Sequence, residues 1–298
     1  MRVQTLIAMA LTACAVPAAM AQPATVLSSA GPEVAAYIDA ALSPVPAHLL
    51  DSPPPIEERY LDVFRARLDE VMTRRESVGL AVAVLERGVP VLVYVNGEEE
   101  AGSGRPITRD TVFRAASVSK GMTGTLLALL EAQGRVNLSD SVPRELLPLP
   151  RGQYASVAEV LSQRTGLRPH ALDREMERGE NVSELRGRLR SQPTVCRPGD
   201  CYSYQNIAFG SVEIIAAQAA GMDFATAMRA HVFERVGMHD ASVGVSAMRQ
   251  SPSWARPHRR RDRDADGMPQ AGDPETVYDA TAAAASVNVS INDMIAWA

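Results

Sequence analysis

The stretch FRAASVSKGM, residues 113–122, contains the one lysine of the chain. Of the thirty basic side chains in the sequence, the other twenty-nine are arginines. Arginine stays protonated in proteins, whereas a buried lysine can lose its proton and accept one from a nucleophile. The presence of a lysine at this single position therefore predicts a chemical role for Lys120.

A serine, Ser117, lies three residues before Lys120, so that both side chains share one face if the segment is helical. We expect a helix from residue 117 to 133, with Gly134 as its C-terminal stop. Apolar residues on most sides indicate a buried helix: they are Met122, Leu126, Leu127, Leu129 and Leu130. Free N–H groups at a helix N-terminus favour negative charge, so Ser117-x-x-Lys120 has the parts of an activated nucleophile. The alternative is a serine N-cap followed by a surface lysine.

A second motif is CYSYQN, residues 201–206. The phenol of Tyr204, close to a positive lysine, can ionise and act as a base or a proton relay. The amide of Asn206 can position either a substrate carbonyl or the lysine. A Tyr-x-Asn triplet is a weak signal by itself, and its weight comes from its combination with Ser117-x-x-Lys120.

Together, the two motifs closely resemble the serine β-lactamase and penicillin-binding-protein superfamily, most of all its class C-like branch. The resemblance covers roughly residues 57–298 and includes four segments: FRAASVSKGMTGTLLALLEAQGRVNLSDSV, VLSQRTGL, CRPGDCYSYQN and HVFERVGMHDASVG. In VLSQRTGL, Gln163 stands where the family usually has a histidine.

This resemblance implies an α+β fold of the β-lactamase/transpeptidase type, with an antiparallel sheet flanked by helices and a helical lobe. It implies Ser117 as the nucleophile, Lys120 as the general base and Tyr204 as their catalytic partner, with Asn206 and Gln205 binding substrate. The implied activity is hydrolysis through an acyl-enzyme, without a metal or organic cofactor. β-Lactams, D-Ala-D-Ala-type peptides, esters and D-amino-acid amides are all implied as substrates, and the sequence does not choose among them.

A third motif of the family, Lys-Thr-Gly or His-x-Gly, does not follow Asn206 in this sequence. Arg164-Thr165-Gly166 precedes Tyr204 and belongs to the VLSQRTGL segment. The final helix, which a capping box from Ser290 to Asp293 predicts, ends within an apolar pattern. We therefore expect a chain whose last strands are missing. The alternative function is a penicillin- or peptidoglycan-binding module that does not turn over.

The domain organisation follows from the pattern before and after residue 117. Residues 57–75 predict an amphipathic helix, and residues 79–97 predict a hairpin with a bulge or edge at Pro90. These elements form an α/β part, 57–116, and a mainly helical lobe, 117–298, follows it with no later group of strands. Its helical patterns cover 156–163, 173–190 and 207–234.

The N-terminus has the pattern of a secretory signal peptide, with one arginine, an apolar run and a cleavage site after Ala21. Lipid attachment at Cys14 is the alternative. Residues 22–56, rich in Pro, Ala and Ser, form a lead-in segment. No later apolar stretch approaches the roughly 18 residues needed to span a bilayer, which predicts a periplasmic or secreted protein.

Charge and composition exclude several classes. A net charge of −5 disfavours a nucleic-acid partner. Cys196 and Cys201 flank the tight turn RPGD, and in an exported chain they predict a disulfide, with a metal site as the weak alternative. The sequence has no Gly-x-Ser-x-Gly elbow, which disfavours a Ser-His-Asp hydrolase, and no His-Glu-x-x-His motif, which disfavours a metallohydrolase. The substrate is therefore expected to be a small or peptidoglycan-derived acyl compound.

Overall fold

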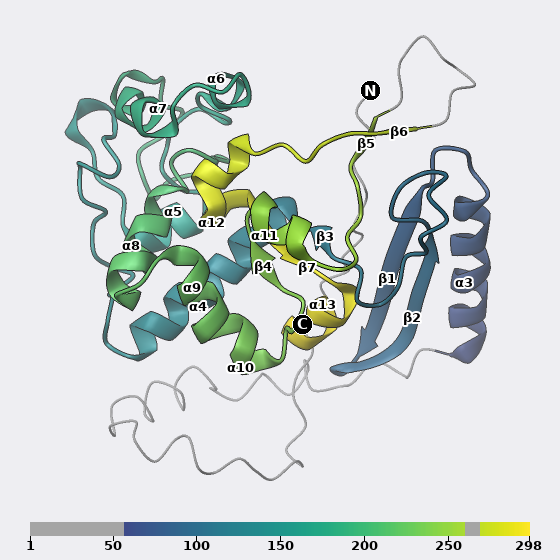
Figure 1. Ribbon diagram of the computed structural model, residues 1–298. Helices are drawn as coiled ribbons and strands as arrows, with labels where there is room; N and C mark the ends of the chain where they lie inside the picture. The colour runs from purple at the N-terminus through teal and green to yellow at the C-terminus, as the bar shows by residue number, and fades with distance from the viewer. Residues whose placement is uncertain (1–56, 260–268) are drawn as a thin grey trace.

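The computed structural model describes residues 57–259 and 269–298. The predicted signal peptide (1–21), the alternative lipid site at Cys14 and the lead-in segment (22–56) lie outside the described residues. In the part of the chain that is described, no helix is both long enough and apolar enough to cross a membrane. The architecture is α+β, as the sequence predicts, with helices packed around antiparallel strands (Figure 1).

The first unit is a helix packed on a hairpin, as predicted. Helix α3 (Glu58–Met72) lies alongside β1 (Gly79–Glu86) and β2 (Val89–Gly97), which pair antiparallel (Figure 1). The register shifts between Val84 and Leu85, opposite Pro90, which confirms the predicted bulge. The buried residues that join helix and hairpin are Leu68, Leu92 and Tyr94. This small cluster holds the unit together.

The second unit is the helical lobe, which begins with a 3₁₀ turn (Ala116–Val118) and helix α4 (Ser119–Ala132). The predicted helix over 117–133 is therefore confirmed, with a tighter first turn. The later helices are α5 (Val157–Leu161), α6 (Asp173–Glu177), α7 (Val182–Arg188), α8 (Ser211–Ala220), α9 (Phe224–Met228), α10 (Glu234–Val236), α11 (Val245–Gln250), α12 (Ala282–Ala285) and α13 (Ile291–Trp297). Short 3₁₀ and π segments join several of them.

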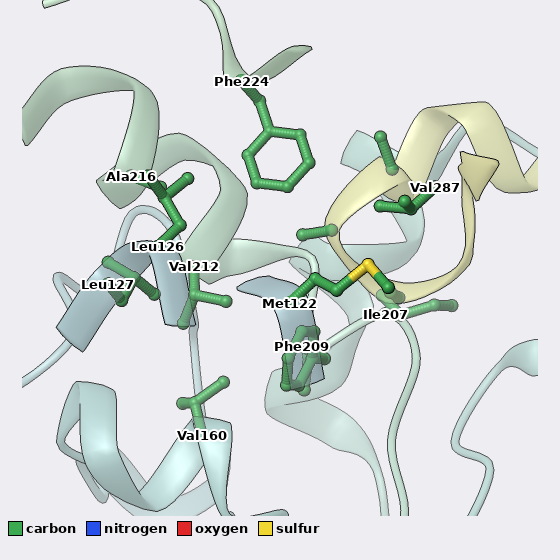
Figure 2. Packing of buried hydrophobic residues seen from close by; sticks show 14 of the residues in the cluster. Met122, Leu126, Leu127, Val160, Ile207, Phe209, Val212, Ala216, Phe224 and Val287 are labelled. Atoms are coloured by element: carbon green, nitrogen blue, oxygen red, sulfur yellow. The ribbon is translucent and has the colours of Figure 1, made fainter. Parts of the chain in front are cut away.

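The core of the lobe forms around α4. Met122, Leu126 and Leu127 are completely buried, which confirms the predicted buried helix. Figure 2 shows Leu126 and Leu127 next to Val212 and Ala216 of α8. The first turns of α4 are thus fixed by dense packing; they carry Lys120 and follow directly on the 3₁₀ turn that holds the predicted nucleophile, Ser117.

Short strands later in the chain correct one prediction. β3 (Phe113–Arg114) and β4 (Ser242–Val243) pair antiparallel on either side of β7 (Val287–Val289), and β5 (His258–Arg259) pairs with β6 (Gln270–Ala271). The expectation of no later group of strands was wrong. Pairings of two or three residues are too short to leave an alternating pattern in the sequence.

Two further local predictions are confirmed. Cys196 and Cys201 form a disulfide. Helix α13 begins with a capping box, in which the Ser290 side chain accepts from the Asp293 N–H and the Asp293 carboxylate accepts from the Ser290 N–H. This box satisfies two N–H groups that the first turn of a helix otherwise leaves without partners.

Candidate active site

The backbone before the predicted nucleophile is strained. Ala116, the residue preceding Ser117, has a φ of 47°, in the left-handed region that is costly for a residue with a Cβ. Bonds to β7 hold this turn in place: the Ala115 N–H donates to the Val287 carbonyl, and the Val287 N–H donates to Ser119 Oγ. Strained residues of this kind persist where the surrounding structure over-determines them, often at functional sites.

Ser117, Lys120 and Tyr204 meet at the start of α4. Ser117 Oγ lies 2.6 Å from the Tyr204 hydroxyl and 3.3 Å from Lys120 Nζ. Lys120 Nζ lies 2.6 Å from the same hydroxyl. The three predicted catalytic side chains are therefore within hydrogen-bond distance of one another, although 84 residues separate the lysine from the tyrosine.

Lys120 is also held from two other directions. Its Nζ donates to Asn206 Oδ1 at 2.8 Å and to the carbonyl of Ala284, on α12, at 2.9 Å. Burial lowers the pKa of Lys120 to about 8, against the charge of Asp173, which raises it. An amine with this pKa is partly neutral near physiological pH, and a neutral amine can accept a proton from a nearby hydroxyl.

Tyr204 responds to burial in the opposite sense. Desolvation raises the pKa of its phenol, although the hydrogen bond with Ser117 opposes this rise. This direction opposes the predicted ionisation of Tyr204 and leaves a protonated hydroxyl between Ser117 Oγ and Lys120 Nζ. A protonated phenol bonded to both can pass a proton from one to the other.

Asn206 and Gln205 have different surroundings. The Asn206 amide donates to Asp173 Oδ2 at 2.8 Å while its oxygen accepts from Lys120, contacts that fit positioning of the lysine. The Gln205 side chain is buried, and its Nε2 donates to the Arg168 carbonyl at 2.6 Å. Its amide is thus engaged with the backbone, and the substrate contact expected for Gln205 stays a prediction.

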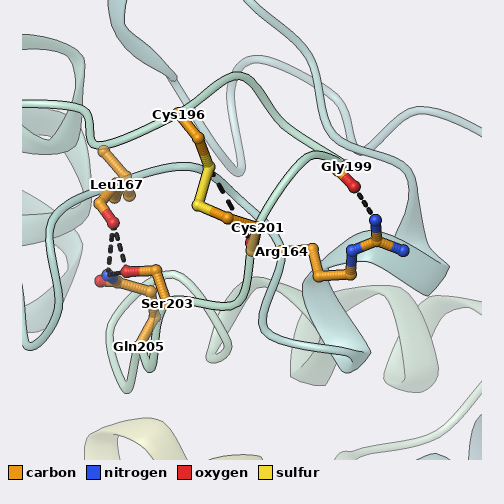
Figure 3. Close-up of a disulfide and its surroundings, with 7 residues drawn as sticks. All are labelled: Arg164, Leu167, Cys196, Gly199, Cys201, Ser203 and Gln205. Carbon is orange, nitrogen blue, oxygen red and sulfur yellow. Dashed lines mark hydrogen bonds between the residues drawn. A yellow bond between two sulfur atoms is a disulfide. The ribbon is translucent and has the colours of Figure 1, made fainter.

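A buried polar frame holds the Tyr204 segment. Gln163 Oε1 accepts from the Gln205 N–H at 2.6 Å, and its Nε2 donates to the Gln205 carbonyl at 3.2 Å. Next to it, Gly166 has a φ of +77°, and a Cβ there would lie 2.5 Å from the Cys196 carbonyl oxygen. Figure 3 shows the Cys196–Cys201 disulfide in the same region, with Ser203 and Gln205 both turned to the Leu167 carbonyl.

Sequence reasoning missed two members of this site. Asp173, the first residue of α6, accepts hydrogen bonds from both Asn206 and His170. The carbonyl of Ala284, which lies in a run of four alanines, accepts a hydrogen bond from Lys120 Nζ. No sequence signal distinguishes Asp173 among 35 acidic residues, and a backbone carbonyl leaves none at all. Within the described residues, no group of three or more His, Cys, Asp or Glu side chains could hold a metal ion.

Comparison with known proteins places this geometry in context. A family model described as Beta-lactamase matches residues 64–298. A β-lactamase from Pseudomonas fluorescens is 27% identical over 190 residues, 63% of this chain and 52% of that protein. Esterase EstB from Burkholderia gladioli is 28% identical over 206 residues, 61% of this chain and 51% of that protein. The chain thus spans about half the length of the curated relatives it matches.

One solved structure shows the same fold at low identity. The β-lactamase/D-alanine carboxypeptidase from Pseudomonas syringae aligns with a TM-score of 0.62 at 24% identity. The alignment covers 80% of this chain and 64% of that one. At this identity the likeness bears on the fold alone.

Proposed function

The chain belongs to the Beta-lactamase family, and from this premise we propose that it is a serine hydrolase that forms an acyl-enzyme at Ser117. One observation carries the proposal: Ser117 Oγ, Lys120 Nζ and the Tyr204 hydroxyl lie 2.6–3.3 Å from one another. A nucleophile within hydrogen-bond reach of a base, itself oriented by further groups, is the arrangement that nucleophilic catalysis requires.

In the acylation step, Ser117 Oγ attacks the substrate carbonyl carbon and its proton passes to neutral Lys120, directly or through the Tyr204 hydroxyl. The backbone N–H of Ser117, at the first turn of the helix, is one donor to the oxyanion that forms. The carbonyl reforms as the bond to the leaving nitrogen or oxygen breaks, and the proton moves from Lys120 through Tyr204 to that atom. The product is an ester of Ser117.

In the second step, water attacks this ester. Its proton passes through Tyr204 to Lys120 and returns to Ser117 Oγ as the ester bond breaks. The net reaction adds one water to the acyl compound and releases a carboxylic acid with an amine or an alcohol. Each proton that Lys120 accepts is given back, so the site returns to its starting state.

The proposed substrates are β-lactams, D-Ala-D-Ala-type peptides, esters and D-amino-acid amides. The names of two relatives support β-lactams and esters within this range, because a β-lactamase and an esterase match the chain at similar identity. We propose export to the periplasm or the medium, by the signal peptide of residues 1–21 with cleavage after Ala21. A second candidate function is acylation of Ser117 without turnover, because the contacts of Ser117 with Lys120 and Tyr204 would equally serve a binding module that forms the ester and does not release it.

The test is the intact mass of the chain from residue 22 onward after incubation with benzylpenicillin, beside a Ser117→Ala control of equal thermal stability. We expect a mass increase of one acyl group in the wild type and none in the control. A chromogenic ester and a chromogenic cephalosporin then separate the two functions. Many product molecules per chain support the hydrolase, and one per chain supports the binding module. A wild-type chain that is folded and stays unmodified by all three compounds contradicts both.

A further inference from the structure

Asp173 is a buried carboxylate for which the steps above have no role. It is only 7% exposed, at the first position of α6. Its Oδ2 accepts from Asn206 Nδ2 at 2.8 Å and from His170 Nδ1 at 2.9 Å. Its Oδ1 is buried and has no hydrogen-bond partner among the described residues. A buried charge is costly unless it is paired, so we expect a contact of the Asp173 carboxylate that offsets this cost.

The contacts of Asn206 connect this carboxylate to Lys120. A carboxylate can only accept hydrogen bonds and an ammonium can only donate them. Between them, the amide must therefore turn its nitrogen toward Asp173 and its oxygen toward Lys120, as it does at 2.8 Å on each side. Asp173 thereby fixes which atom of Asn206 receives the lysine. A residue without an acceptor at position 173 would leave the Asn206 nitrogen without its partner.

The charge of Asp173 also acts on the lysine directly. It raises the pKa of Lys120, while the larger effect of burial lowers it. The same charge contributes to the raised pKa of Tyr204 and of Tyr278, which lies next to α6 and bonds Glu177. The His170 side chain, 62% exposed, bonds the same Asp173 Oδ2 as Asn206, and its ring lies tilted against the Tyr204 ring with the centroids 5.2 Å apart.

The remaining charged groups near the site lie on other elements. From α8, Glu213 accepts from the Ala283 N–H of α12 and interacts with Arg186 of α7. From β3, Arg114 donates to the Ala285 carbonyl and pairs with Asp279. Asp173 is the group whose charge opposes the effect of burial on Lys120.

We propose that Asp173 is a positioning residue for Lys120: its carboxylate orients the Asn206 amide that receives Nζ and places a negative charge near that nitrogen. Its importance for catalysis rests on the proposed function. The effect on the lysine does not, and it can be measured without any substrate.

The single lysine of the sequence makes this measurement direct. Labelling with ¹³Cε-lysine gives one side-chain signal, and its titration by NMR reports the protonation of Lys120 alone. We expect the wild-type midpoint near the value of about 8 that burial produces. In Asp173→Asn, which keeps the size of the side chain, the midpoint should fall by about one pH unit, because a favourable charge is lost. Glu175→Gln, on the same helix but paired with Arg178 at the surface, is the matched control and should leave the midpoint unchanged.

A second variant keeps the proposal falsifiable if Asp173→Asn does not fold. His170→Ala removes an exposed side chain that donates to the same carboxylate oxygen, so more of the Asp173 charge should act on Lys120. Its midpoint should rise by about 0.3 pH unit. An unchanged or higher midpoint in folded Asp173→Asn overturns the proposal, as does a lower one in His170→Ala. If Lys120 titrates as expected and no acyl compound reacts, the proposed function fails and this inference stands.

Discussion

The two walls around Ser117 are held by different forces. We call α4 with α12 the helix wall, and residues 163–173 with 193–206 the loop wall. Behind the helix wall, most of the fully buried side chains are apolar, among them Met122, Leu126 and Leu127 (Figure 2), and the polar exceptions on α4 are Ser119 and Thr123. The buried side chains of the loop wall include a group of polar ones, of which Figure 3 shows Ser203 and Gln205. The full group is Gln163, Thr165, Asp173, Ser203, Gln205 and Asn206.

This difference determines how each half of the site can fail. Apolar packing is non-directional, and a core accepts many hydrophobic side chains of about the right volume. A buried hydrogen-bond network is directional, and losing one partner leaves another group desolvated and unpaired. The helix wall should therefore fail mainly through the chemistry of Lys120, whereas the loop wall should fail through any single polar residue.

The largest effect is expected from Lys120→Arg, in the helix wall. Arginine keeps the charge and stays protonated, so it cannot take the proton of Ser117. Acylation by a chromogenic ester, followed by stopped-flow, should slow by about 10³-fold or more. The wild-type kcat/KM should rise about tenfold per pH unit up to about 8, the pKa to which burial lowers Lys120, and the variant should show no such rise.

Two observations would contradict that account. One is a rate close to the wild type in Lys120→Arg. The other is a pH dependence that survives the substitution, which would assign the titration to another group. A thermal melt within a few degrees of the wild type is the control, because the slower rate must not reflect unfolding of the helix wall.

A smaller effect, on stability first, is expected from Gln163→Leu in the loop wall. The change leaves the buried N–H and carbonyl of Gln205 without their side-chain partners. Urea denaturation should show a loss of about 3 kcal/mol in the free energy of unfolding. Gln218→Leu, on the exposed side of α8, is the matched control and should change it by less than about 0.5 kcal/mol.

If Gln163→Leu is as stable as the control Gln218→Leu, the loop wall does not depend on its buried hydrogen bonds, and the contrast with the helix wall fails. The contrast becomes sharper if Gln163→Leu also slows acylation while the titration midpoint of Lys120 stays unchanged. That result would mean that the loop wall positions Tyr204 and has little influence on the burial of the lysine.

The helix wall was the easier half to predict from the sequence. Ser117 and Lys120 are three residues apart, so a local rule brings them together, and the apolar residues that bury the helix follow a helical pattern. Tyr204 and Asn206 were found through the resemblance to a family rather than by spacing. The strained φ of Ala116 left no signal, because alanine is not typical of the left-handed region.

The parts that could not be predicted depend on contacts distant in the sequence. Asp173 is 33 residues from Asn206, and Ala284 is 164 from Lys120. Gln205 is the one residue of its triplet whose side-chain bonds run to the backbone of residues 163–168 and not to the Ser117 cluster. Its predicted contact with substrate rests on the resemblance alone. The short strands β3, β4 and β7 form only because the lobe brings them together.

The smallest effect is expected from removing the Cys196–Cys201 disulfide in Cys196→Ser/Cys201→Ser. The bond closes a loop with a sequence separation of only 5, for which the chain-entropy model gives about 2 kcal/mol. The loop wall keeps other bonds across this segment, including Val195 N–H to the Gly166 carbonyl and Gly199 N–H to the Arg164 carbonyl. We therefore expect urea denaturation to show that loss while the acylation rate changes less than about threefold.

Dithiothreitol provides the control for this last prediction. It should destabilise the wild type to the level of the double variant and leave the double variant unchanged, because no other disulfide is found in the described residues. If the double variant loses acylation while it stays folded, the disulfide itself positions Tyr204. The hydrogen bonds of the loop wall would then be insufficient for that task, and covalent closure would have to be counted as a third force, beside apolar packing and hydrogen bonding.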